Sequence, residues 1–110
     1  MSFRHATLAA GRWKTFTFLE QMANVASEVE RALNWRTKNN PGYAQRAFER
    51  ALELLDLTLG STERPTQRRE VARVREALVD FFSGANSYGS TDASWRGYFL
   101  AFAYAARRAH

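Results

Sequence analysis

Residues 18–33 read FLEQMANVASEVERAL, and this stretch decides the fold. Its apolar side chains recur at steps of three and four, which places them on one face of an α-helix. Met22, Val25, Val29 and Leu33 mark that face. The same spacing continues outward on both sides, so the sequence predicts a long amphipathic helix.

Three further segments show the helical period, and none shows the alternation of a strand. Pro41 and Gly42 are expected to end the first helix, with Gly42 accepting a positive φ, and Gly60 is expected to take the left-handed position after the second. Because the links are short, we predict an all-α fold, an antiparallel up-down-up-down four-helix bundle that forms a single domain. The helices are predicted at about 13–38, 43–59, 66–83 and 92–108 of the 110 residues.

Composition excludes several kinds of site. The chain has no cysteine, which removes disulfides, iron–sulfur clusters and thiol nucleophiles. Its two histidines, His5 and His110, stand near opposite ends of the chain. The Glu-x-x-His pairs of di-iron bundles, the phosphate-binding loops and the nucleophile elbow are all absent. The sequence therefore predicts no metal, no cofactor, no small-molecule substrate and no catalysis.

The N-terminal segment shows neither a membrane span nor a signal peptide. No apolar run in the chain reaches the roughly 18 residues that a spanning helix needs. Residues 1–12 have a basic start, but their apolar part is short and interrupted by Thr7. We expect a cytoplasmic protein without membrane contact, in which residues 1–12 form a loosely ordered arm.

Charge points to an anionic partner. The chain carries 16 Lys and Arg against 11 Asp and Glu, a net charge of +5, and all the cations except Lys14 and Lys38 are arginines. Arginine offers a planar fork that fits phosphate and carboxylate groups. The positive charge therefore indicates binding to an anion, without identifying which one.

An arginine cluster surrounds the start of the third predicted helix. Cations at a helix N-terminus oppose the helix dipole, so an anion is needed to compensate them. Two interpretations remain open: contact with nucleic-acid phosphate, favoured for Arg68 and Arg69, or pairing with acidic residues of neighbouring helices, favoured for Arg75. The predicted nucleic-acid contacts are Arg64, Arg68, Arg69 and Arg73. On the outer faces of helices two and three, Arg50 with Glu53 and Arg73 with Glu76 are expected to form i,i+3 pairs.

Large apolar side chains also fall outside the predicted core faces. Such residues grouped with arginine are typical of protein interfaces. They fit either an interface, self-association in particular, or simple packing against the N-terminal arm or within a slightly rotated helix. The predicted partner interface comprises Trp35, Leu57, Arg96, Leu100, Tyr104 and Arg107.

Three segments look like those of small helical bacterial proteins: SEVERA at 27–32, RALELLDLT at 50–58 and RVREALVD at 73–80. The plan of the whole chain resembles the ribosomal intervening-sequence proteins and the accessory variability proteins of diversity-generating retroelements. This likeness is one of length, helical pattern and Arg-rich surface. The retroelement resemblance implies a ring-forming homo-oligomer that binds a reverse transcriptase and nucleic acid and has no catalysis of its own.

The leading hypothesis is a non-enzymatic, basic binding module that self-associates and binds RNA or DNA, or an enzyme that acts on them. The alternative is a helical toxin–antitoxin component that binds a protein partner or cleaves RNA. Cleavage would have to rely on combinations of carboxylates and arginines such as Glu28, Arg31, Asp56 and Arg75. A third reading is a structural protein partner that binds no anion.

Overall fold

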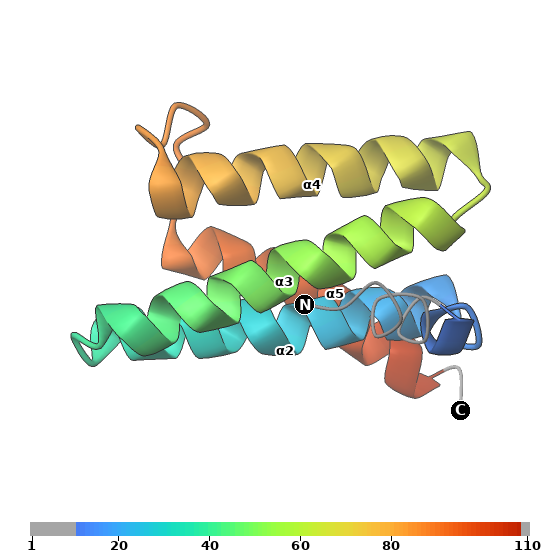
Figure 1. The fold of residues 1–110 in the computed structure, drawn as a ribbon, viewed down its shortest axis with the longest axis horizontal. Coiled ribbons are helices and arrows are strands. Elements are labelled where there is room, and N and C mark those ends of the chain that lie inside the picture. Colours follow the sequence, from blue (N-terminus) through green and yellow to red (C-terminus); the bar gives the residue numbers. More distant parts are fainter. Residues whose placement is uncertain (1–10, 109–110) are drawn as a thin grey trace.

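A computed structural model describes residues 11–108. In this range a helical turn at residues 11–13 precedes four long helices, and there is no strand, so the all-α prediction is confirmed. Helices that follow one another along the chain run in opposite directions (Figure 1). The long helices are α2 (Phe18–Thr37), α3 (Pro41–Ser61), α4 (Pro65–Ser83) and α5 (Asp92–Arg108).

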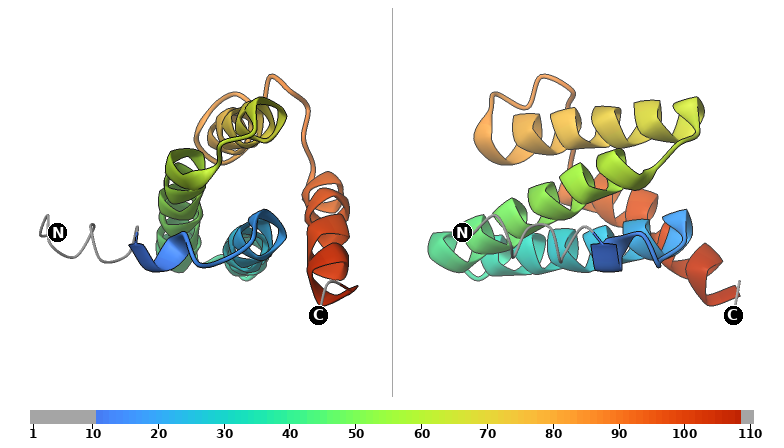
Figure 2. Two further views of the ribbon diagram at one scale, coloured as in Figure 1. Left: turned by 90° about the vertical axis from the view of Figure 1, so that its right-hand side faces the viewer. Right: turned by 45° about the vertical axis from the view of Figure 1, so that its right-hand side comes forward.

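Helix α2 is the centre of the packing. It lies between α3 and α5, while α4 packs mainly on α3 (Figure 2). The helices therefore pack in the order α4–α3–α2–α5, which leaves α4 and α5 at the two ends of the series. This arrangement places a groove between α4 and α5, described below.

The hydrophobic core contains the apolar face of α2, whose spacing in the sequence predicted the helix. Met22, Val25 and Leu33 are completely buried, and Val29 is 2% exposed. They pack with residues from all three other helices, including Leu55, Leu78 and Phe99. Burying each such side chain contributes about 1.5–3 kcal/mol, so this shared face is the main source of stability.

Helix α2 begins later than predicted, at Phe18 and not at Trp13. Thr17 caps it: the Thr17 side chain accepts from the Glu20 amide, and the Glu20 carboxylate accepts from the Thr17 amide, a reciprocal capping box. Trp13 belongs to the preceding turn, and its indole N–H donates to Thr58 on α3 at 2.9 Å. The predicted loose arm lies outside the described residues except for 11–12, which form the helical turn with Trp13.

The glycine predictions at the next two helix ends were wrong. Asn39, with φ 58°, takes the left-handed position after α2. Asn40 then caps α3, and Pro41 and Gly42 fall in its first turn, where proline's missing N–H costs nothing. Gly60 lies inside the last turn of α3 and has no positive φ.

The long loop between α4 and α5 is held by one side chain from the end of α4 and one from within the loop. The Asp80 carboxylate accepts from the amides of Ser87 (2.8 Å) and Tyr88 (3.0 Å). The Asn86 side chain accepts from the Ser90 amide and donates to the Ser90 carbonyl, both at 2.9 Å. These bonds order a loop that exposes 58% of Tyr88.

Candidate nucleic-acid interface

The predicted arginine cluster separates into structural and unpaired members. Arg68 is structural: its guanidinium donates to the carbonyls of Leu59 (2.8 Å) and Thr62 (3.1 Å). These carbonyls stand at the C-terminal end of α3, where helix carbonyls lack partners and a cation is favourable. Arg68 therefore fastens α4 to α3.

Arg75 pairs with an acidic residue of a neighbouring helix, as favoured from the sequence. Its guanidinium forms two bonds to the Asp56 carboxylate on α3, at 2.7 and 3.3 Å. This bidentate contact is the geometry for which arginine is suited.

The two expected i,i+3 pairs were wrong. Within the described residues, Arg50 forms its ion pair with Glu28 on α2, at 3.8 Å. Glu76 instead accepts from the hydroxyl of Tyr88 at 2.8 Å. In each contact the donor and the acceptor belong to different segments of the fold, α3 and α2 for the first and the loop after α4 and α4 itself for the second, so neither is the expected pair within one helix.

Arg64, Arg69 and Arg73 remain. All three are exposed, and none forms an ion pair with a described residue. Arg64 is the N-cap of α4 and gives that helix no side-chain cap. The N-terminal half of α4, with its N-cap, therefore concentrates positive charge that no carboxylate of residues 11–108 pairs with.

Arg69 and Arg73 line a groove between α4 and α5, which we call the α4–α5 groove. Its volume is about 540 Å³. Val74 and Ala77 line it from α4, Trp95 and Tyr98 from α5, and Thr66, Glu70, Ser90 and Ser94 add polar groups. Sequence reasoning predicted the arginines but missed the groove, because the position of α4 beside α5 depends on how both helices pack in the tertiary structure.

One carboxylate in this groove is already engaged. Glu70 accepts from the Tyr98 hydroxyl at 2.8 Å, which links α4 to α5. Burial, together with this hydrogen bond, raises the pKa of Tyr98 far above its ordinary value. Tyr98 therefore stays a neutral donor at physiological pH, and Glu70 is held by it.

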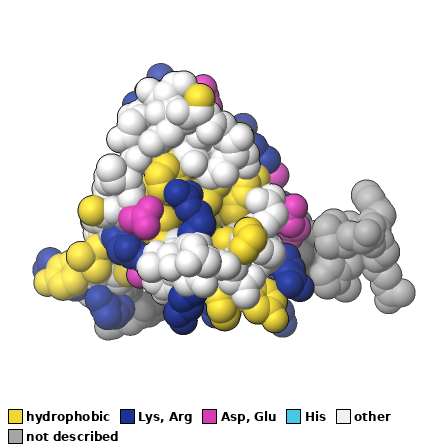
Figure 3. Space-filling view, turned by 90° about the vertical axis from the view of Figure 1, so that its left-hand side faces the viewer, with side chains coloured by type: hydrophobic (Ala, Val, Ile, Leu, Met, Phe, Trp, Pro, Cys, Tyr) yellow, Lys and Arg dark blue, Asp and Glu magenta, His cyan; other side chains and the backbone are white. Residues whose placement is uncertain are grey.

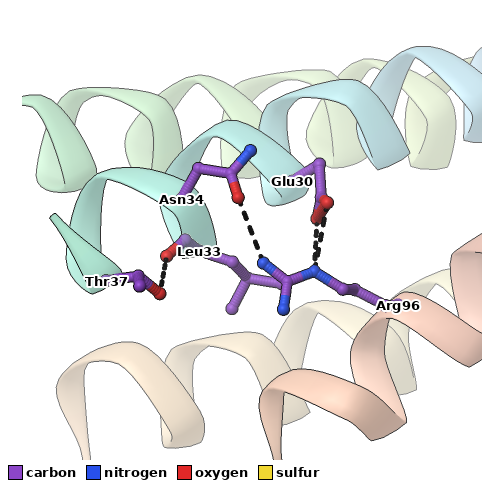
Figure 4. A network of polar contacts seen from close by, with 5 residues as sticks. All are labelled: Glu30, Leu33, Asn34, Thr37 and Arg96. Atoms are coloured by element: carbon purple, nitrogen blue, oxygen red, sulfur yellow. Dashed lines mark hydrogen bonds and ion pairs between the residues drawn. The ribbon is translucent and has the colours of Figure 1, made fainter.

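Arg96, predicted at a partner interface, forms contacts within the chain. Its Nε donates to both carboxylate oxygens of Glu30, at 2.8 and 3.0 Å, and one terminal nitrogen donates to Asn34 at 3.2 Å (Figure 4). These bonds join α5 to α2.

Trp35 and Leu57, also predicted at the interface, are both half-buried. The Trp35 ring packs 4.8 Å from that of Tyr43, and the Lys38 ammonium lies 5.2 Å from its centroid. At this end of the molecule Lys and Arg side chains lie beside hydrophobic ones (Figure 3). Packing on α3 therefore accounts for much of what made Trp35 unusual in the sequence.

Leu100 and Tyr104 are the large apolar members of the predicted interface that stay exposed, at 63% and 56%. Arg107 is exposed as well and forms no ion pair with a described residue. Beside Leu100 lies a second groove of about 600 Å³ between α2 and α5, which we call the α2–α5 groove. Sequence reasoning missed it, although the small residues Ala23 and Ser27, four apart on α2, are its signal.

The carboxylates considered for cleavage do not form one site. Glu28 is 7% exposed and accepts from Arg31 at 2.7 Å, while its second oxygen is buried without a hydrogen-bond partner among residues 11–108. Asp56 is taken by Arg75 at a separate contact between α3 and α4. His5 and His110 lie outside the described residues.

Two further features of residues 11–108 are their possible metal ligands and their possible membrane spans. No three His, Asp or Glu side chains there could jointly hold a metal ion. None of the helices there has both the length and the apolar character of a membrane span.

Comparison of the chain with protein-family models, curated proteins and solved structures finds no match.

Proposed function

We propose that this chain is a non-enzymatic, cytoplasmic binding module, an antiparallel four-helix bundle that self-associates and binds nucleic acid in its α4–α5 groove. The observation that carries the proposal is the position of Arg69 and Arg73, which line this groove without a carboxylate partner among the described residues. An arginine side chain without a carboxylate partner offers its planar fork to another anion, and phosphate fits that fork.

Single-stranded nucleic acid is the favoured ligand. Proteins that bind single strands combine a positive groove with aromatic side chains against which bases pack. The α4–α5 groove has this composition, with Arg69 and Arg73 beside the half-buried Tyr98 and the edge of Trp95, which is 6% exposed. Arg64 extends the positive surface at the N-terminus of α4. Arg68 contributes positive charge, but its guanidinium already donates to α3 carbonyls and is not free to bind a phosphate.

The experiment measures anisotropy of labelled single-stranded RNA, single-stranded DNA and duplex at two salt concentrations, about 50 and 200 mM. Arg69→Ala combined with Arg73→Ala should weaken single-strand binding at least about tenfold and reduce the slope of log K against log salt by about 1.4, for two phosphate contacts. Lys38→Ala with Arg46→Ala is the matched control. It removes the same charge from side chains whose cationic groups lie over aromatic rings and form no ion pair with a described residue.

Each result bears on the proposal. Loss confined to the groove variant supports it, whereas equal losses in both variants indicate unspecific charge attraction and overturn the groove assignment. Absence of binding at low salt overturns nucleic-acid binding altogether. Gel analysis of the incubated RNA completes the test, because cleavage would contradict a non-enzymatic role and favour the toxin alternative.

We also propose that the protein partner is an enzyme that acts on nucleic acid, such as a reverse transcriptase. This proposal is supported by the resemblance in plan to retroelement accessory proteins. Co-purification with a reverse transcriptase encoded nearby would test this part, and a complex that forms without nucleic acid is the expected result.

A further inference from the structure

The α2–α5 groove is apolar and has a smooth wall. Val29, Leu33 and Phe99 line it together with small residues, among them Ser27 and Gly97. Small side chains at these positions leave room for a protruding side chain to enter between the two helices. Trp95 also lines this groove, and its buried indole N–H has no acceptor among the described residues.

A protruding side chain stands at the edge of the same groove. Leu100 lines it and is 63% exposed, and Tyr104, one turn further along α5, is 56% exposed. Neighbouring apolar groups exposed to this extent mark an interaction surface. The surface thus carries both a projection and a hollow, which is what a self-complementary contact across a two-fold axis requires.

Charge favours a second copy over an oppositely charged partner. The chain carries +5, yet the charged groups that line this groove, Glu30 and Arg96, already form an ion pair at 2.8 Å. The groove lining is therefore neutral overall, which limits the repulsion between two copies at this groove. Beyond the lining, Arg108 lies 5.7 Å from the Tyr104 ring. A strongly acidic partner would gain no special attraction at this face.

We propose that the α2–α5 groove is the self-association surface of this protein, a two-fold contact in which Leu100 of each copy enters the groove of the other. This inference rests on the self-association part of the proposed function and specifies where it occurs. In the contact, Leu100 lies against Ser27 and Gly97 of the opposite copy, and Tyr104 covers the edge of the interface. Trp35 and Leu57 have no part in it.

The absence of cysteine allows a direct test. Proteins carrying Leu100→Cys and Ser27→Cys singly are mixed under mild oxidation and the disulfides identified by mass spectrometry. The mixed disulfide should form well above the level seen when Tyr88→Cys replaces Leu100→Cys in the mixture. Tyr88 is a matched control because it is 58% exposed but lies in the loop after α4.

Sedimentation measures the same contact without cross-linking. Leu100→Ser should weaken dimerisation at least about tenfold, as expected for the central apolar residue of an interface, while Tyr88→Ser should leave it unchanged. If Leu100→Ser does not weaken the dimer and the mixed disulfide does not form, this inference is overturned, while self-association itself is still supported. A strictly monomeric wild-type protein overturns self-association as well. Nucleic-acid binding is measured separately and depends on neither result.

Discussion

The hydrogen bond between Trp13 and Thr58 should contribute measurably to stability. Trp13 is 6% exposed, Thr58 is completely buried, and their bond of 2.9 Å joins positions 45 residues apart. Thr58→Val keeps the shape of the side chain but leaves the indole N–H buried without an acceptor. A buried donor that loses its partner costs about 1–3 kcal/mol, so the free energy of unfolding should fall by that amount. In a domain of this size each kcal/mol lowers Tm by about 4–8 °C.

Urea unfolding followed by circular dichroism measures the effect. Thr37→Val is the control, because the Thr37 hydroxyl bonds only the Leu33 carbonyl of its own helix and the residue is exposed. Its effect should stay within about 0.5 kcal/mol. Trp13→Phe and the double variant complete a cycle, which should give a coupling energy of about 1 kcal/mol between the two side chains. Equal effects of the two valine variants, or a coupling energy near zero, would refute the reasoning.

Two further predictions concern pH and glycine. Burial and the Glu70 hydrogen bond raise the pKa of Tyr98, so the folded protein keeps a proton that the unfolded chain releases. The stability that Tyr98 contributes is present below pH 10.0, the ordinary pKa of tyrosine, and is lost as pH rises above it. Tyr98→Phe should therefore flatten the alkaline decline of the urea unfolding midpoint. An unchanged decline would contradict the assignment to Tyr98. Gly60→Ala should raise the free energy of unfolding by about 0.5–1 kcal/mol, because the added Cβ meets open space inside a helix. Gly84→Ala should lower it, because its Cβ would lie 3.0 Å from the Asp80 carbonyl oxygen. Urea unfolding measures both variants, and equal effects of the two substitutions would contradict this prediction.

The helix ends illustrate how far the sequence could be read. The start of α2 was readable, because Thr17 and Glu20 have the spacing of a capping box, but the apolar period through Trp13 masked it. At the end of α2 two asparagines follow one another, and the left-handed residue is Asn39, although glycine is the commoner choice. These errors moved boundaries by a few residues and left the helical faces unchanged.

The arginine cluster shows the corresponding limit for the candidate site. Local sequence identifies Arg68, Arg69 and Arg75 as cations near one helix start, and it suggested internal pairing for Arg75. It could not reveal that Arg68 reaches the carbonyls of Leu59 and Thr62, because those acceptors exist only where α3 ends beside α4. The unpaired state of Arg69 likewise depends on which carboxylates the neighbouring helices bring near.

The sequence by itself determined the all-α fold and the core faces, because the helical period and the apolar spacing are local properties of each segment. It also determined the chemical inventory: many arginines, no cysteine, and histidines only near the two ends. Only the tertiary structure decided that α4 and α5 flank one groove, and that α2 and α5 form another beside the exposed Leu100. The reason is physical, since grooves and ion pairs between helices depend on the order in which the helices pack, and no single segment contains that information.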